Sequence, residues 1–284
     1  GFVVSPGFNI IPKFTVTFPN GNADPNLTDK LKVGHRVGAT DTPYTITWTS
    51  SSSQTKTLSV VLRYSLDGGT SFPNIIATTA NDGSYVWDSG NGGAPNAIST
   101  QVKIRVEDAS DNVAKDSSNE NVKVISNFKL NVPNTATPCN GGTTVCEVND
   151  PLTLTWENIG TVNNVELALS TDSGSNFSNV FVPTTANTAS YSWTVADAIS
   201  SNVRIRAKST TDDGSDMSDV NFRIRGKLAV TAPTTGGRLA IALPATVTWT
   251  ATGNIPQVDI FYDTNDGKGA DNIAGNADDY PTQI

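Results

Sequence analysis

The chain has 284 residues, of which 37% are hydrophobic and 16% are charged, and its net charge is −8. This length and hydrophobic content suffice for two or three domains, each with its own core, which excludes a disordered chain. The sequence holds no cluster of Lys and Arg, so a nucleic-acid partner is excluded. It also holds no run of about 18 apolar residues, so we expect no membrane-spanning helix.

Three segments of the chain open in the same way. FTVTFPN begins at Phe14, FKLNVPN at Phe128 and LAVTAPT at Leu228. Each alternates apolar and polar residues up to a proline, which predicts a half-buried β-strand that ends at a turn. The chain therefore contains three copies of one repeat.

Each copy then reaches a second predicted strand with a tryptophan at its centre: Trp48, Trp156 and Trp249. A tryptophan in this place predicts one large side chain at the centre of a sandwich core. A third strand follows in each copy and runs into a glycine-containing turn.

The first two copies continue in parallel through SYVW and SYSW to QVKIRV and NVRIRA. Tyr85 with Trp87, and Tyr191 with Trp193, fall on one face of their strands because side chains alternate with a period of two. About seven short strands in roughly 100 residues predict an immunoglobulin-like or fibronectin-III-like sandwich. The expected fold class is therefore all-β, with tandem antiparallel β-sandwich domains.

The repeat boundaries divide the chain into four segments. Residues 1–13 align with the last strand of a repeat, 14–126 and 127–226 form two complete sandwiches, and 227–284 form a third copy that lacks the later strands. Only one to three residues link neighbouring copies, which predicts a semi-rigid rod. Two explanations of the incomplete ends stay open. Either the chain is a window of a longer array, or residues 1–13 of one subunit complete the third sandwich of another copy by strand addition.

The stretch RYSLDGGTSF, residues 63–72, contains the pattern S-x-D-x-G-x-S-F and resembles the Asp-box, a hairpin-turn motif of sialidases and other secreted proteins. In this motif we expect Asp67 to accept turn N–H groups, Gly69 to permit a positive φ and Phe72 to anchor the turn to the core. The second copy repeats the arrangement with Asp172, Gly174 and Phe177. A sialidase would carry the motif every 40 to 50 residues, whereas the period here is about 100, so we interpret it as a structural turn.

In the third copy an acidic, glycine-rich insertion occupies the same hairpin. Residues 255–284 hold six Asp and one Lys, a balance of −5, so the remaining residues total only −3. Clustered carboxylates repel one another unless water or a cation lies between them, and Ca²⁺ prefers oxygen ligands. The candidate ligands are Asp263, Asn265, Asp266, Asp271, Asp278 and Asp279. The spacing is not that of an EF-hand, and a solvated acidic loop is the alternative.

The two cysteines, Cys139 and Cys146, enclose the short loop NGGTTV. Such a loop lets the two ends of a hairpin meet, so we predict a disulfide and an oxidising, extracytoplasmic compartment. Two free thiols are the alternative.

Catalysis has little support in the sequence. His35 is the single histidine, and it lies in the polar stretch KVGHRVGA. A surface histidine explains it better than a catalytic one, and we predict that the chain is not an enzyme. Asn26 and Asn176 match the acceptor pattern for N-glycosylation, with chance occurrence as the alternative.

The tryptophan strand, the SxDxGxxF hairpin, the SYxW strand and the VxIR strand together resemble the tandem immunoglobulin-like and fibronectin-III-like repeats of large bacterial cell-surface or secreted proteins. The resemblance implies an extracellular structural segment of a fibre, filament, surface layer or stalk. Its expected partners are copies of itself or neighbouring repeats. The alternatives are an adhesin-type module that binds a glycan or host surface, and an accessory region of a secreted hydrolase.

Overall fold

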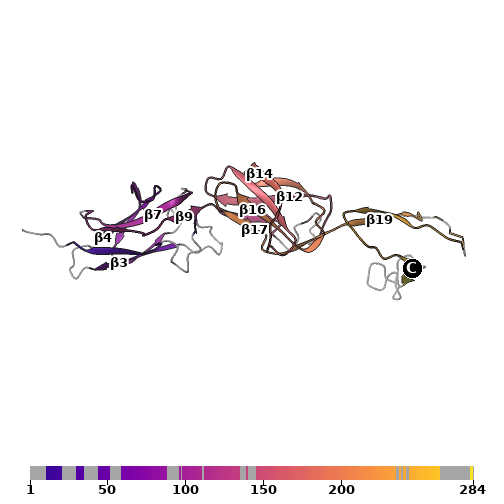
Figure 1. Cartoon of the computed structure of the whole chain (residues 1–284), viewed down its shortest axis with the longest axis horizontal. Coiled ribbons are helices and arrows are strands. Elements are labelled where there is room, and N and C mark those ends of the chain that lie inside the picture. The colour runs from indigo at the N-terminus through magenta and orange to yellow at the C-terminus, as the bar shows by residue number, and fades with distance from the viewer. Residues whose placement is uncertain are drawn as a thin grey trace, which may run out of the picture.

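A computed structural model describes residues 11–20, 30–34, 44–51, 59–87, 96, 98–110, 112–134, 139, 145–234, 237, 239–240, 243–262 and 282–283. All the regular structure in these ranges is β-strand, which confirms the all-β fold class. No helix in the described ranges is long and apolar enough to cross a membrane. Two sandwiches and then the strands of the third copy follow one another along the longest axis (Figure 1).

Two facing sheets form the first sandwich. The smaller sheet has the order β1 (Lys13–Phe18), β3 (Tyr44–Ser51), β6 (Ser84–Trp87). The larger sheet has the order β2 (Lys30–Lys32), β9 (Val122–Ile125), β7 (Ser99–Asp108), β4 (Ser59–Ser65), β5 (Asn74–Ala80), and β8 (Lys115–Ser117) also pairs with β7.

The second sandwich repeats this order strand for strand. Its smaller sheet is β10 (Asn127–Val132), β12 (Pro151–Ile159), β15 (Ser190–Thr194). Its larger sheet is β11 (Val145–Glu147), β18 (Phe222–Arg225), β16 (Ser200–Ser209), β13 (Asn164–Ser170), β14 (Asn179–Ala186), with β17 (Ser215–Met217) beside β16.

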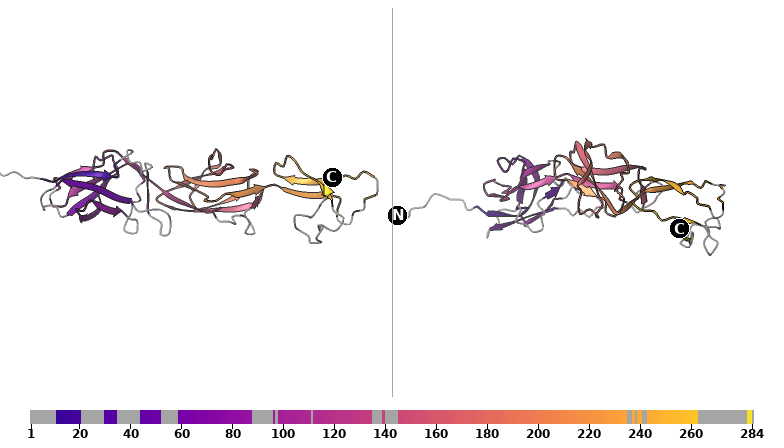
Figure 2. Two further views of the ribbon diagram at one scale, coloured as in Figure 1. Left: turned by 90° about the horizontal axis from the view of Figure 1, so that it is seen from below. Right: turned by 45° about the vertical axis from the view of Figure 1, so that its right-hand side comes forward.

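The third copy contributes two separate strand pairs. β19 (Lys227–Ala232) pairs with β20 (Thr248–Thr252), and β21 (Phe261–Tyr262) pairs with β22 (Thr282–Gln283). Figure 2 shows this part at the end of the row of domains, in two further views.

Alternation of side chains builds the cores. Along β12 the side chains of Leu152, Leu154 and Trp156 are buried, whereas those of Pro151 and Thr153 are exposed. Each strand therefore turns one face to the facing sheet, as the period-two pattern of the sequence predicts. One core cluster runs from Phe14 to Val124 and the other from Phe128 to Ile224.

The tryptophans separate the two closed sandwiches from the third copy. Trp48 is 3% exposed and Trp156 is 1% exposed, but the equivalent Trp249 is 41% exposed. Truncating a buried tryptophan to alanine costs about 3–5 kcal/mol, so Trp48 and Trp156 are major contributors to their cores. Trp249 is exposed because, among the described residues, no second sheet covers β19 and β20.

Two short strands in each sandwich were not predicted from the sequence. β2 and β11 pair in parallel with β9 and β18, the last strands of their sandwiches, so one pair in each sandwich is not antiparallel. β8 and β17 are also only three residues long. Three residues are too few to display a period, so about seven strands were expected, whereas the described residues of each sandwich form nine.

The two sheets of each sandwich are joined at a β-bulge. The pairing of β10 with β12 shifts between Leu130 and Val132, and the backbone N–H of Leu130 donates to Asp216 Oδ2 at 2.7 Å. In the first sandwich Val16 donates to Asp116 Oδ2 at the same distance. Burial raises the pKa of Asp216. These aspartates supply the acceptor that a neighbouring strand would otherwise provide.

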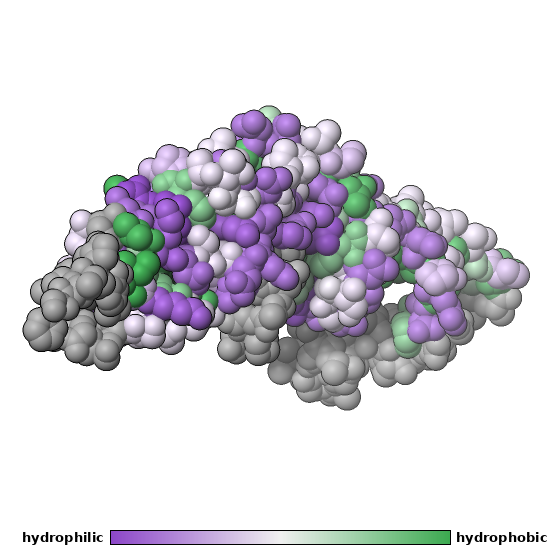
Figure 3. All heavy atoms as spheres, turned by 60° about the vertical axis from the view of Figure 1, so that its left-hand side comes forward, coloured by the Kyte–Doolittle hydropathy of each residue, from purple (hydrophilic) through white to green (hydrophobic). Residues whose placement is uncertain are grey.

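Most of the surface is hydrophilic on the face shown in Figure 3, and hydrophobic residues form separate patches there. Scattered apolar residues are normal on a protein surface.

Candidate functional site: hairpin turns and inter-repeat joints

The turn after β4 is held by a serine and an aspartate. The backbone N–H of Gly69 donates to Ser65 Oγ at 2.8 Å, and Ser65 Oγ donates to Asp67 Oδ1 at 2.6 Å. Ser71 donates to the same carboxylate through its backbone N–H at 3.0 Å and through Oγ at 2.6 Å. These hydrogen bonds lower the pKa of Asp67, and the bond from Ser65 contributes most. Gly69 adopts a positive φ of 91°, which glycine permits without strain.

The turn after β13 has the same construction. Ser170 Oγ accepts the N–H of Gly174 at 2.9 Å and donates to Asp172 Oδ1 at 2.5 Å. The N–H of Asn176 donates to Asp172 Oδ1 at 2.9 Å. The hydrogen bond from Ser170 is the main reason that the pKa of Asp172 is lowered. Both aspartates therefore hold the backbone of a turn.

The aromatic residue of each turn does not lie in the core, contrary to the expected anchoring. The guanidinium carbon of Arg105 lies 4.1 Å from the ring centroid of Phe72, and that of Arg206 lies 4.7 Å from the ring of Phe177. Both rings are half-buried. The contact is a cation–π interaction between the turn and the neighbouring strand. Both arginines belong to the recurring VxIR pattern. This pattern is the feature of the sequence that could have predicted the contact with the turn.

The cysteines form a disulfide. Cys139 and Cys146 have Cα atoms 5.1 Å apart, and both side chains are buried in the second core. Cys146 lies in β11, so the bridge ties Cys139 to the short parallel strand at the edge of the larger sheet.

The six candidate calcium ligands, Asp263, Asn265, Asp266, Asp271, Asp278 and Asp279, lie outside the described residues, as do His35 and Asn26. The calcium site stays a prediction. Within the described ranges no group of three or more His, Cys, Asp or Glu side chains could hold a metal ion.

The first joint, between the two sandwiches, is centred on Ser126 and Asp212. Ser126 separates β9 from β10 and is fully buried. It donates to Asp212 Oδ1 through its backbone N–H at 3.0 Å and through Oγ at 2.8 Å. Asp212 also accepts Ser209 Oγ at 2.7 Å and the N–H of Gly214 at 2.6 Å. One loop carboxylate of the second sandwich thus binds the linker.

A second contact of the first joint joins two loops. Thr161 donates its N–H to Asn96 Oδ1 at 2.8 Å, and Asn96 Nδ2 donates to Thr161 Oγ1 at 3.0 Å. The side chain of Ile98 packs against both cores, and Ile159 of the second sandwich packs against the first core. Apolar packing and hydrogen bonds therefore both cross the joint.

Glycine permits the close approach at this joint. Gly160 has a φ of 104°, and a Cβ there would lie 3.3 Å from Ile98 Cδ1. The second joint, between β18 and β19, repeats the arrangement: Gly253 has a φ of 92°, and a Cβ would lie 3.3 Å from Ile199 Cδ1. The sequences NAIS and DAIS, which begin at Asn96 and Asp197, supply the equivalent isoleucines.

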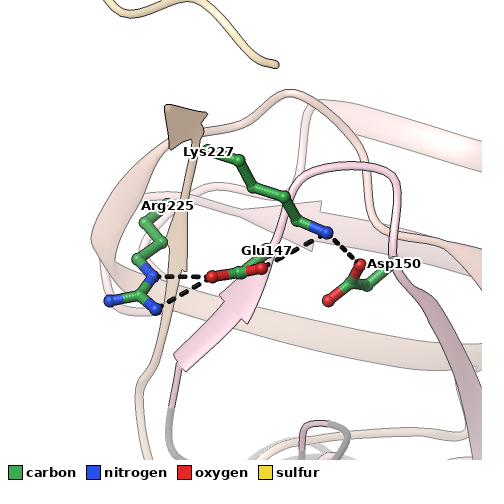
Figure 4. Close-up of polar contacts among 4 residues, drawn as sticks. All are labelled: Glu147, Asp150, Arg225 and Lys227. Carbon is green, nitrogen blue, oxygen red and sulfur yellow. Dashed lines mark hydrogen bonds and ion pairs between the residues drawn. The ribbon is translucent and has the colours of Figure 1, made fainter. Parts of the chain in front are cut away.

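Ion pairs hold the second joint (Figure 4). Lys227 Nζ lies 2.5 Å from Asp150 Oδ1 and 3.2 Å from Glu147 Oε2. Arg225 Nη2 lies 2.8 Å from Glu147 Oε1. Hydrogen bonds from Arg225 and then Lys227 lower the pKa of Glu147, and hydrogen bonds to Asp150 and then Glu147 raise the pKa of Lys227.

The equivalent position in the first joint is neutral. Asn127 aligns with Lys227, and its Nδ2 donates to the carbonyl oxygen of Gly34 at 3.3 Å. An ion pair across the first joint is longer, with 3.7 Å between Lys123 Nζ and Asp213 Oδ2. The two joints thus share their glycine and isoleucine but differ in charge.

The order of the strands decides the fold class. In each sandwich one sheet joins the first, third and sixth strands, and the other joins the second, last, seventh, fourth and fifth. Each sandwich is immunoglobulin-like. Strands β1 to β9 and β10 to β18 therefore form two immunoglobulin-like sandwiches in tandem.

Comparisons with known proteins give structures but no family. No family model matches the chain, and no curated protein matches it. The fibronectin(III)-like modules of CbhA from Clostridium thermocellum match with 15% identity and a TM-score of 0.23, over 74% of this chain and 94% of that chain. A tetra-tandem repeat in the extending region of a large adhesion protein matches with 18% identity and a TM-score of 0.25, over 79% of this chain. The match spans 52% of that protein's chain.

Proposed function

We propose that this chain is a structural, non-catalytic segment of an extracellular cell-surface assembly, in which the sandwiches act as rigid spacers. The observation that carries the proposal is the shared construction of the two joints. In both, a glycine with a positive φ lies against an isoleucine of the preceding sandwich. A flexible string of domains would need no such contact, because its linkers would be long and solvated.

The disulfide between Cys139 and Cys146 favours an oxidising compartment. It supports an extracellular location for the proposed assembly. The proposed assembly is a fibre, a filament, a surface layer or a stalk.

The rigid spacer is tested by the distance between the two sandwiches. Ile75 in β5 and Val180 in β14 are exposed at equivalent positions, so each accepts a spin label after substitution by cysteine. Pulsed electron paramagnetic resonance on the doubly labelled chain is expected to give one narrow distance distribution. A broad distribution, as from two independently moving domains, would contradict the proposal.

We also propose that the chain associates with itself by strand addition. Residues 1–13 of one copy would pair as a strand with the third repeat of another copy, where Leu228, Val230 and Trp249 are exposed. Sedimentation of the full chain would then show a concentration-dependent ladder of oligomers that disappears when residues 1–13 are deleted. A chain that stays monomeric at high concentration would end this part of the proposal.

A binding module of the adhesin type is the second candidate, and the tryptophans disfavour it. Sugar sites use exposed aromatic platforms, but Trp48, Trp87, Trp156 and Trp193 are buried in the cores. Trp249 is the exception. A glycan array that gives a hit lost in Trp249→Ala would favour the adhesin over the spacer. An accessory region of a secreted hydrolase is the third candidate, and no described contact favours it.

A further inference from the structure

The turn that follows β13 ends in the sequence Asn176-Phe177-Ser178. Asparagine two residues before serine, with a residue other than proline between them, is the acceptor pattern for N-linked glycosylation. The pattern alone is short enough to arise by chance, so its surroundings in the fold decide whether it is usable.

Asn176 lies on the surface of the turn. The residue is exposed, and its carbonyl oxygen Oδ1 accepts the backbone N–H of Ser178 at 2.9 Å. The backbone N–H of Asn176 is itself held by Asp172 Oδ1 at 2.9 Å. Both ends of the residue are therefore fixed, and Nδ2 donates no hydrogen bond within the described part of the chain.

The hydrogen bond from the Ser178 N–H to Asn176 Oδ1 holds the two residues of the acceptor pattern close together. It brings the carboxamide of Asn176 and the backbone of Ser178 into one short turn, and Ser178 is exposed as well. An enzyme that must reach the amide nitrogen and the hydroxyl at the same time meets both on the surface.

Asn187, by contrast, uses its carboxamide internally. Nδ2 of Asn187 donates to Asn158 Oδ1 at 2.8 Å and to the carbonyl oxygen of Val162 at 3.0 Å, and Asn187 is followed by Thr188 and Ala189, which do not match the pattern. The equivalent turn of the first sandwich has Ser71 and Pro73 in place of Asn176 and Ser178. There Ser71 Oγ donates to Asp67 Oδ2 at 2.6 Å.

We propose that Asn176 is an attachment site for an N-linked oligosaccharide. The donor is an oligosaccharide carried on a lipid through a phosphate ester. Nδ2 of Asn176 forms a bond to the anomeric carbon of the first sugar, the bond from that carbon to the phosphate oxygen breaks, the lipid phosphate leaves with the electron pair, and the amide loses one proton. The inference requires export of the chain but not its function as a spacer.

The test is the mass of the peptide that contains Asn176, from protein purified from the cells that naturally make it. Trypsin is unsuitable because no Lys or Arg occurs between Lys129 and Arg204, so cleavage at acidic residues is used. We expect an added mass made of sugar residues, with the fragment ions placing it on Asn176. A peptide that is entirely unmodified overturns the proposal.

Matched variants separate attachment from folding. They are secreted from a host that performs N-glycosylation, with Asn26→Gln in every chain so that the other acceptor pattern is silent. Asn176→Gln and Ser178→Ala should both abolish the added mass, whereas Ser178→Thr should keep it. Ser71→Asn with Pro73→Ser should create a second modified site in the first sandwich. Sugar that persists in Asn176→Gln, or no sugar on Asn176 in the well-folded Ser178→Thr chain, contradicts the proposal.

Discussion

At the scale of single residues, Asp67 and Asp172 do the same work in two turns. Each carboxylate accepts hydrogen bonds from the serine two residues before it and from the backbone four residues after it. Donors that face the carboxylate favour its charged form, so the pKa of each aspartate is lowered. The turns thus depend on charged carboxylates.

The lowered pKa values predict how acid acts on the turns. A carboxyl whose pKa is lower in the folded state adds stability above its unfolded pKa of about 3.9, and this contribution is lost as the pH falls through the folded value. Asp67→Asn and Asp172→Asn should therefore lower the melting temperature at pH 7, and the difference from the wild type should shrink below pH 4. Thermal unfolding across that range measures it. Asp82→Asn, in another exposed turn, is the control, and a difference that does not change with pH would contradict the explanation.

At the scale of elements, loops from neighbouring sandwiches meet at the joints. The loop between β16 and β17 reaches back to Ser126, and a Cβ at Gly214 would overlap Ser126 Oγ and lie 2.5 Å from Ser126 O. The equivalent residue of the first sandwich is Ala114, which is buried without difficulty. The turn itself therefore tolerates alanine, and the joint is what requires glycine.

Gly214→Ala should open the first joint and leave both sandwiches folded. The added methyl group displaces Ser126 from Asp212, which loosens the linker. The distance distribution between labels at positions 75 and 180 should broaden, while circular dichroism stays that of the wild type. Gly237→Ala serves as the control, because its Cβ would meet Thr234 O at 2.9 Å in the third copy and not the first joint. A distribution as narrow as that of the wild type would show that the joint absorbs the methyl group.

The charged second joint should respond to salt. The pKa of Glu147 is lowered and that of Lys227 is raised, so both groups stay charged from acid to alkaline pH. The contribution of Glu147 is lost only as the pH falls through its lowered value, and that of Lys227 only as the pH rises through its raised value. Salt screens exposed pairs instead, since the Debye length falls from about 10 Å at 0.1 M to about 3 Å at 1 M.

We expect the distance distribution between labels at Val180 and Val230 to broaden when sodium chloride is raised from about 0.1 M to 1 M, because the Debye length shortens over this range. Lys227→Asn reproduces the residue of the first joint at this position and should remove most of the salt dependence. The distribution across the first joint, between positions 75 and 180, should change less. Equal salt responses at the two joints would contradict the assignment of the ion pairs as the difference.

At the scale of the whole molecule, the chain is a row of similar units with one exceptional segment. The two sandwiches share a strand order and a turn held by an aspartate, and each is followed by a joint with a glycine–isoleucine contact. The third copy carries six of the chain's aspartates in residues 255–284, and β21 and β22 pair on either side of the acidic insertion. This segment is where the molecule departs from its own repeat.

If the acidic insertion binds Ca²⁺, adding the ion should raise the melting temperature of the chain, because a ligand that binds only the folded state stabilises it. The rise should disappear in Asp271→Ala. Differential scanning calorimetry with Ca²⁺ and with a chelator measures it, and Mg²⁺ at the same concentration controls for ionic strength. An unchanged melting temperature in the wild type would favour the solvated loop.

Much of the molecule could be predicted from the sequence because the information is local and repeated. Alternation along the strands, the tryptophan at the centre of β12 and the prolines at strand ends act within a few residues, so the all-β fold and the three copies follow from them. The pattern around Asp67 likewise acts within one turn.

The tertiary structure decided the contacts between residues far apart in the chain. Asp212 binds Ser126 across 86 residues, Lys227 binds Asp150 across 77, and Arg105 covers the ring of Phe72 in place of the expected core contact. These pairs depend on how loops approach one another, and no period in the sequence encodes that approach. The sequence by itself determined a chain of sandwiches, whereas only the folded structure decided that one joint is held by hydrogen bonds to a carboxylate and the next by ion pairs.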